Sequence, residues 1–295
     1  MPKNVIISIP AYNEEKSIGN VINSIKKVMD KTKYKYKISV VSDGSKDKTV
    51  EVAKKCGAIV YPLPYNYGLA EAFRTEMKKA LELKADIIVH TDADGQYLSE
   101  EIPNLIKEVE NGYDLVLGSR FRGRIHYMPL MKRIGNKAFS RVISKVTRLR
   151  ITDAQTGFRA FTKDVAKLDI ISDHTYTQEQ IIKAVHNKFR IKEIPVTFAK
   201  RKSGKSRLLK NPFEYAIKAW INLFRIYRDY RPLKFFGSFG LLFLSIGLLI
   251  GLYLVSLFII TGKVGHLPLT MVTVLSILLG VQIIFFGFLA DMKKR

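Results

Sequence analysis

Two long runs without a charged residue occupy the C-terminal part of this chain, and they restrict its fold more than any other feature. No Asp, Glu, Lys or Arg occurs between Lys234 and Lys263, or from Val264 to Ala290. A helix needs about 20 predominantly apolar residues to cross a bilayer. The sequence therefore predicts a transmembrane hairpin within residues 233–295, with spans at about 235–261 and 267–290.

The remainder of the chain is strongly basic, and the formal net charge is +23. Residues 120–150 contain ten Lys or Arg and no acid, and residues 200–234 contain eleven Lys or Arg against two acids. The second group directly precedes the first span, where basic residues orient a membrane protein and attract anionic lipids. We therefore expect membrane lipids, and not nucleic acid, as the partner of these residues.

The basic residues also predict the topology of the hairpin. The chain ends in Lys293-Lys294-Arg295, whereas the loop between the spans, residues 261–268, carries one Lys. Both basic flanks belong on the cytoplasmic side. No signal peptide precedes the strand-like segment after Lys3. We expect a two-span protein of the cell membrane with its catalytic domain and both termini in the cytoplasm.

Strand-like and helix-like segments alternate through the first 120 residues. The predicted strands are 5–9, 38–41, 58–61, 87–91 and 114–118, and the predicted helices are 15–29, a segment from 48, 69–83 and 100–110, the last capped by Ser99. This order is typical of an α/β fold with a mostly parallel sheet and helices on both faces. Ligands bind such sheets beyond the carboxyl ends of the strands, where Asp43 and Asp92 lie.

An acidic turn follows the fourth predicted strand. Asp92 and Asp94 are two residues apart, and Gln96 follows them. Carboxylates in this spacing can bind one divalent cation, and Mg²⁺ takes few protein oxygens because it keeps positions for water and phosphate. The turn is therefore a candidate cation site.

Four segments together resemble the GT-A fold, a Rossmann-like fold, of the family 2 glycosyltransferases. They are Ile9-Pro10-Ala11-Tyr12-Asn13-Glu14-Glu15, Ser42-Asp43-Gly44-Ser45-Lys46-Asp47, the Asp92/Asp94/Gln96 turn, and Gly118-Ser119-Arg120-Phe121. The later segment Asp153–Arg159 resembles the one that closes the acceptor side in that family. The hairpin narrows the resemblance to polyprenyl-phosphate glycosyltransferases, such as dolichol-phosphate mannose and glucose synthases and the undecaprenyl-phosphate sugar transferases. Ser42 departs from the pattern, because many relatives carry an acid there.

The resemblance implies a role for each group of residues. The implied catalytic residues are Asp92, Asp94, Gln96 and Arg120. The implied nucleotide-sugar site comprises Pro10, Tyr12, Glu14, Asp43, Asp92, Ala93, Asp94, Arg201 and Arg207. Asp92, Asp94 and Gln96 would hold Mg²⁺ or Mn²⁺, and Arg120, Lys132 and Arg133 would hold the acceptor phosphate. Residues 1–210 would be the catalytic domain, and residues 211–232 a juxtamembrane amphipathic helix.

The implied reaction is an inverting transfer from UDP-glucose, UDP-N-acetylglucosamine or GDP-mannose to dolichyl or undecaprenyl phosphate. A phosphate monoester carries a charge of about −1.5 to −2 at neutral pH and is itself a nucleophile. This explains why no general base is conspicuous in the sequence. Two basic amphipathic segments, 129–146 and 212–230, are predicted to lie at the membrane surface. Because two spans form a thin membrane domain, a homo-oligomer is also compatible with the sequence.

Two other functions remain open at this point. A processive polysaccharide synthase shares the fold, but such enzymes typically carry Gln-x-x-Arg-Trp before their membrane helices, and Trp220, the only tryptophan, lies in a different context. A non-catalytic adaptor that holds anionic lipids would explain the charge but not the acidic turn. Metal-dependent binding of a nucleotide-sugar distinguishes an enzyme from an adaptor.

Overall fold

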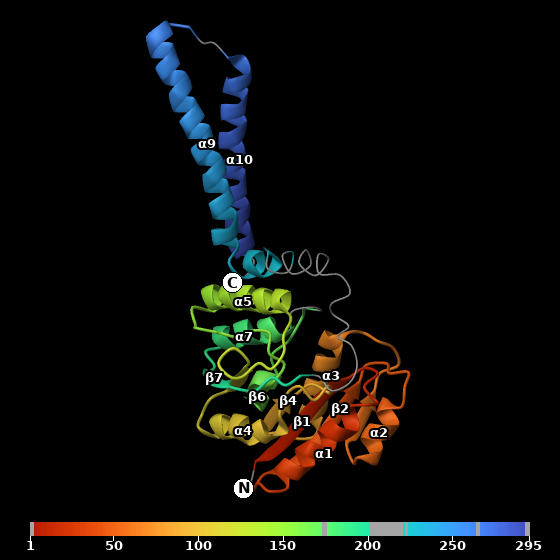
Figure 1. Ribbon diagram of the computed structural model, residues 1–295. Coiled ribbons are helices and arrows are strands. Elements are labelled where there is room, and N and C mark those ends of the chain that lie inside the picture. The colour runs from red at the N-terminus through yellow and green to blue at the C-terminus, as the bar shows by residue number, and fades with distance from the viewer. Residues whose placement is uncertain (1–2, 173–175, 201–220, 222–223, 264–265, 293–295) are drawn as a thin grey trace. The chain divides into compact units, whose positions relative to one another are not determined.

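A mixed sheet forms the centre of the N-terminal part of the protein in the computed structural model (Figure 1), which describes residues 3–172, 176–200, 221, 224–263 and 266–292. Two compact units, Met1–Ala216 and Ile217–Arg295, make up the chain. Among the described residues the sheet has seven strands in the order β3-β2-β1-β4-β6-β5-β7. They are β1 (Asn4–Ala11), β2 (Lys35–Ser42), β3 (Ile59–Pro62), β4 (Ile87–His90), β5 (Leu115–Ser119), β6 (Arg159–Thr162) and β7 (Ile191–Pro195).

The predicted α/β fold is confirmed. β6 pairs antiparallel with β4 and β5, and the other neighbouring strands pair parallel. β6 and β7 lie beyond the segments from which strands were predicted, so they are additions to the predicted sheet. The helices of this unit are α1 (Ile18–Met29), α2 (Thr49–Lys55), α3 (Leu69–Glu82), α4 (Ile102–Glu110), α5 (Leu130–Thr147), α6 (Lys163–Ala166) and α7 (Tyr176–His186).

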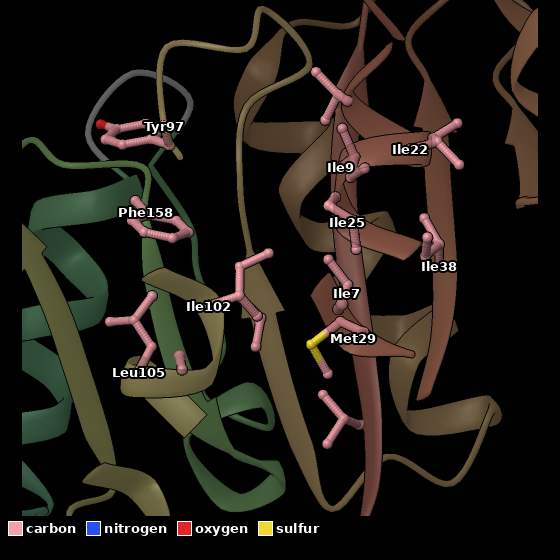
Figure 2. Packing of buried hydrophobic residues seen from close by; sticks show 14 of the residues in the cluster. Ile7, Ile9, Ile22, Ile25, Met29, Ile38, Tyr97, Ile102, Leu105 and Phe158 are labelled. Carbon is pink, nitrogen blue, oxygen red and sulfur yellow. The ribbon is translucent and has the colours of Figure 1, made fainter. Parts of the chain in front are cut away.

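The two faces of the sheet differ in character. On one face, alternate residues of β1 such as Ile7 and Ile9 pack with Ile22 and Ile25 of α1, as Figure 2 shows, and α4 joins the same apolar cluster. The other face carries Phe161 and His90, and it packs against Phe73 of α3 and the start of α7. Helices therefore cover both faces, and the carboxyl ends of the central strands are left to the loops.

The predicted cap of the fourth helix is wrong. Ser99–Glu101 form a short 3-10 turn, and α4 begins at Ile102. Pro103 lies in the first turn of the helix, where its missing N–H costs nothing. Glu101 occupies the N-cap position without capping the helix, because its carboxylate accepts the N–H of Thr197 at 2.8 Å.

The C-terminal unit contains two long apolar helices, α9 (Pro232–Thr261) and α10 (Leu267–Met292). Their mean hydropathies of 2.6 and 2.4 and their lengths suit membrane crossing. They pack against each other, from Gly287 beside Leu233 to Gly251 beside Thr273, and they fit the predicted hairpin. Before them, residues 224–230 are helical.

Glycines allow α9 and α10 to approach closely. A Cβ atom on Gly280 would lie 2.7 Å from the backbone N of Leu244 and 2.8 Å from the carbonyl O of Gly240. A Cβ atom on Gly247 would lie 2.7 Å from Ile277 Cγ1. Small residues at such contacts are typical of packed membrane helices, since van der Waals contact replaces the hydrophobic effect there.

We predict that Gly280→Val destabilises the hairpin. The added atoms would overlap backbone atoms of α9, which cannot rotate away, and overpacking of this kind costs about 1–3 kcal/mol. Thermal unfolding of the full-length protein in detergent measures the loss. Gly237→Val is the matched control, because no atom lies within 4 Å of a Cβ placed at Gly237. Equal melting temperatures for the two variants would contradict the close packing.

Candidate functional site

The acidic turn leaves the end of β4 and is held by its own backbone. Asp92 and Asp94 are both partly exposed. Gly95 has a φ of +71°, which turns the chain back, and the N–H of Gln96 donates to Asp94 Oδ1 at 3.0 Å. The two carboxylates therefore share one short turn at the carboxyl edge of the sheet.

The environment of Asp92 opposes its negative charge. Burial, followed by the nearby charge of Asp94, raises the pKa of Asp92 to about 6, whereas charges on His90, Arg120 and Lys132 act to lower it. Gly157 lies directly against this carboxylate: a Cβ at Gly157 would be 2.9 Å from Asp92 Oδ1. Two carboxylates that lie close together and repel each other favour a bound cation, because the cation would relieve their repulsion.

The donor set fits a hard divalent cation. Two carboxylates and one amide oxygen are oxygen ligands of the kind that Mg²⁺ and Mn²⁺ take. Within the described ranges there is no cluster of three or more His, Cys, Asp or Glu that could hold a metal. A cation on two carboxylates and one amide oxygen would keep positions for water and phosphate.

Gln96 connects the turn to a segment far along the chain. Its side-chain Nε2 donates to the carbonyl of Ala199 at 3.0 Å, and its own carbonyl accepts the N–H of Ala199 at 2.8 Å. The backbone N–H of the neighbouring Phe198 donates to the carbonyl of Arg124, and its carbonyl accepts the N–H of His126. The ring of Phe198 packs on Tyr97 with centroids 5.3 Å apart. The turn and residues 197–199 therefore form one braced structure.

Arg120 is buried and fully engaged with Asp153. Arg120 is 4% exposed and Asp153 is 0% exposed. Arg120 Nε donates to Asp153 Oδ2 at 2.7 Å, Nη2 donates to Oδ1 at 2.8 Å, and the backbone N–H donates to Oδ2 at 3.0 Å. Burial alone would lower the pKa of Arg120, but Tyr97 and Asp153 outweigh it and raise that pKa. Arg120 is a permanent buried cation near Asp92, and its guanidinium lies 5.2 Å from the Phe198 ring centre.

A carboxylate that the sequence analysis did not single out orients Asp153. Glu193 of β7 is 7% exposed and accepts the N–H groups of Thr152 and Asp153, each at 2.9 Å. Thr152 in turn shares a hydrogen bond with Ser119 at the end of β5. Glu193 lies 40 residues from Asp153 in sequence, so no local pattern indicates the pairing.

The residues expected around the nucleoside lie at the ends of β1 and β2. Pro10 is buried within β1, and Tyr12 and Glu14 are partly exposed just beyond it. Asp43 is 5% exposed, and its two oxygens accept the N–H groups of Tyr67 and Gly68 at 2.8 and 3.0 Å. Asp43 therefore fixes the loop before α3.

The residues expected at the acceptor phosphate include Lys132 and Arg133 on α5. Lys132 is partly exposed, and its charge reaches Asp92; Arg133 is exposed. Phe139 and Ile143 face the protein, whereas Leu130 and Ile134 are 70% and 54% exposed. Arg201 and Arg207 lie outside the described residues, as does most of the segment 211–232.

Known proteins that this chain resembles include glycosyltransferases. A model of the family described as "Glycosyl transferase family 2" matches residues 6–168, more than half of the chain. A UDP-N-acetylglucosamine–dolichyl-phosphate N-acetylglucosaminyltransferase of Methanococcus voltae is 34% identical, over 66% of this chain and 85% of its own length. An undecaprenyl-phosphate 4-deoxy-4-formamido-L-arabinose transferase of Shewanella sediminis is 28% identical, over 99% and 87%.

A solved structure shares the fold. Glucosyl-3-phosphoglycerate synthase from Mycobacterium tuberculosis, crystallised with Mn²⁺, UDP and phosphoglyceric acid, superposes with a TM-score of 0.57. Its sequence is 18% identical, and the match covers 75% of this chain and 78% of that one. At this identity the likeness shows the fold alone.

We predict that Gly157→Ala impairs the acidic turn without unfolding the protein. The new methyl group would displace the Asp92 carboxylate, so the affinity for Mn²⁺, measured by electron paramagnetic resonance, should fall at least about tenfold, as when a ligand's support is lost. Gly19→Ala is the control: its Cβ would crowd Val52 Cγ1 at 3.1 Å, in helix α1 and away from the turn. Unchanged Mn²⁺ affinity in Gly157→Ala would show that Asp92 does not bind the cation.

Proposed function

This chain belongs to glycosyl transferase family 2, and from that premise we propose that it transfers a sugar from a nucleotide-sugar to a polyprenyl phosphate at a membrane surface. The observation that carries the proposal is one juxtaposition: the Asp92/Asp94 turn lies next to the buried cation of Arg120, in a chain that continues into two apolar helices. The two relatives named above act on dolichyl and undecaprenyl phosphates, which supports this acceptor class.

The donor would bind across the carboxyl ends of the strands. Pro10, Tyr12 and Glu14 would contact the nucleoside, and Asp43 would support the pocket through the loop of Tyr67 and Gly68. The diphosphate would lie over Asp92, Ala93 and Asp94, with Arg201 and Arg207 as further cationic contacts. UDP-glucose, UDP-N-acetylglucosamine and GDP-mannose are the donors to test.

Asp92, Asp94 and Gln96 would hold Mg²⁺ or Mn²⁺. Such an ion, when bound, neutralises charge that builds on the leaving nucleoside diphosphate. The chain's own task is to hold the two carboxylates in one orientation. Gly157 leaves room for Asp92, and Gln96 keeps the turn fastened to Ala199.

The acceptor phosphate would attack the anomeric carbon from the side opposite the diphosphate. A bond forms between a phosphate oxygen and that carbon while the bond to the donor diphosphate breaks, so the configuration inverts. No proton must be removed from the nucleophile. Lys132 and Arg133 would bind this phosphate, and Arg120 supplies positive charge from its buried position, because two anionic substrates have to be brought together.

The membrane would deliver the acceptor. Leu130 and Ile134 are exposed on α5 beside exposed Arg133 and Lys137, a combination suited to an anionic lipid surface. With the hairpin as anchor and basic residues on both its flanks, the catalytic domain and both termini would lie in the cytoplasm. The division proposed is a catalytic domain at 1–210, a juxtamembrane helix at 211–232 and the hairpin at 233–295. Homo-oligomerisation would be compatible with this arrangement.

We predict a lipid product that depends on the metal and on the acceptor phosphate. Purified protein should convert one of the three nucleotide-sugars and a polyprenyl phosphate into a polyprenyl-phosphate sugar, identified by mass spectrometry. EDTA should abolish the product, and Mg²⁺ or Mn²⁺ should restore it. Asp94→Ala should lower the rate at least about a thousandfold, since the clamp on the leaving group is worth several kcal/mol.

The free polyprenol is the matched acceptor control, because it differs only in lacking the phosphate. Asp164→Ala is the matched protein control, since Asp164 is an exposed acid paired with Lys167 on the surface. Transfer to polyprenol at a comparable rate, or full activity of Asp94→Ala, would refute the proposed reaction.

A further inference from the structure

A row of buried polar side chains crosses the sheet below the acidic turn. Ser39, Ser8, His90 and Arg159 are successive partners in strand register, from β2 through β1 and β4 to β6. Each is 0% exposed. Residues paired in register share one face of a sheet, and this is the face opposite the apolar cluster of Ile7 and Ile9.

Several atoms of this row have no hydrogen-bond partner in the described part of the chain. They are Ser8 Oγ, Ser39 Oγ, His90 Nε2, Arg159 Nε and, from α3, Glu76 Oε1. Central strands of mostly parallel sheets are normally apolar. Four buried polar side chains in one row at the centre of such a sheet therefore call for an explanation.

The centre of the row is a pair formed by Glu76 and His90. His90 Nδ1 and Glu76 Oε2 lie 2.8 Å apart, and both side chains are 0% exposed. The imidazole packs edge-on against Phe73 and Tyr176, at interplanar angles of 79° and 74°. One hydrogen bond and two aromatic rings thus fix the position and the plane of His90.

The row supports Asp92 from two directions. His90 is the last residue of β4, and the chain enters the acidic turn two residues later. On the other side, Arg159 Nη2 donates to the carbonyl of Thr156, which directly precedes Gly157. Gly157 borders the Asp92 carboxylate, since a Cβ added to Gly157 would lie 2.9 Å from Asp92 Oδ1. Arg159 is itself held by Gln180 Oε1 at 2.9 Å and by the carbonyl of Thr177.

We propose that Glu76 and His90 are positioning residues for Asp92. Their hydrogen bond fixes the end of β4, and Arg159, the register neighbour of His90, fixes Gly157 on the other side of the same carboxylate. Neither Glu76 nor His90 touches a substrate. The inference rests on the proposed function, because it assigns them a role toward the carboxylate that would hold the cation.

The test compares two substitutions of nearly equal size at one position. Glu76→Gln keeps an oxygen that accepts from His90 Nδ1, whereas Glu76→Met removes it. Mn²⁺ affinity is measured by electron paramagnetic resonance on the full chain, together with the melting temperature. We expect Glu76→Met to bind Mn²⁺ about 10- to 100-fold more weakly, as for other partners of metal ligands, and Glu76→Gln to stay within about threefold of the wild type.

A double variant separates positioning from stability. Glu76→Met/His90→Phe leaves neither side chain unpaired, so it should melt no lower than the wild type, since apolar replacement of a buried polar pair is often neutral or stabilising. Its Mn²⁺ affinity should nevertheless remain low. If Glu76→Met does not fold, the Mn²⁺ affinity of the double variant is measured in its place. Ser39→Ala, in the same row but two strands from β4, is the control and should bind Mn²⁺ normally.

The outcomes distinguish this inference from the proposed function. If the wild type binds no Mn²⁺, or Asp94→Ala binds it equally well, the cation site itself is refuted. If the wild type binds Mn²⁺ through Asp94 while folded Glu76→Met and the double variant bind it equally well, only the positioning role is overturned. Weak binding in Glu76→Gln as well as in Glu76→Met would also overturn it, since the hydrogen bond would then not be the cause.

Discussion

The buried ion pair between Arg120 and Asp153 is the interaction on which the rest of the site depends. It joins the end of β5 to the segment that leads into β6, and Glu193 of β7 orients Asp153 from behind. Removing one partner of a buried pair leaves an uncompensated charge and costs about 3–5 kcal/mol. The pair also keeps a fixed positive charge close to Asp92. The end of β5, the segment before β6 and Glu193 of β7 therefore meet around this ion pair.

A fixed cation beside an acidic turn suits a reaction between two anions. Residues that must move to meet a substrate spend energy on reorganisation, whereas a charge held in advance does not. Arg120 is already desolvated and paired, so under the proposed function it would contribute a field, and exposed residues such as Arg133 would contact the acceptor. Two neighbouring residues help to keep this arrangement fixed. Gly157 leaves space for the Asp92 carboxylate, and the ring of Phe198 packs beside the Arg120 guanidinium. The two apolar helices fit a membrane hairpin, and in the proposed function this hairpin would hold the chain at a membrane surface, where a lipid phosphate is concentrated.

Features encoded by neighbouring residues were predictable from the sequence, and features encoded by distant pairs were not. The first five strands, the hairpin and the acidic turn follow from local periodicity and spacing, and the structure contains them. The burial of Arg120 depends on Asp153, 33 residues away, and no local pattern reveals it. Asp43 fastens a loop 24 residues further on. The Glu76–His90 pair links α3 to β4. The sequence around Glu76 has the pattern of an ordinary amphipathic helix, so it does not indicate the pair. The cap was misplaced at Ser99 because a 3-10 turn, Ser99–Glu101, directly precedes α4, as is frequent at helix ends.

The most direct test of this account is a double-mutant cycle on the ion pair, with Arg120→Met, Asp153→Leu and their combination. The free energy of unfolding of the N-terminal unit is measured by denaturant titration of the full-length protein in detergent. We predict that each single variant loses about 3–5 kcal/mol and that the double variant recovers at least about 2 kcal/mol of the summed loss. We also expect the stable double variant to be inactive, because the fixed charge is gone. Additive losses, or a double variant that transfers sugar at the wild-type rate, would show that the ion pair does not have this role.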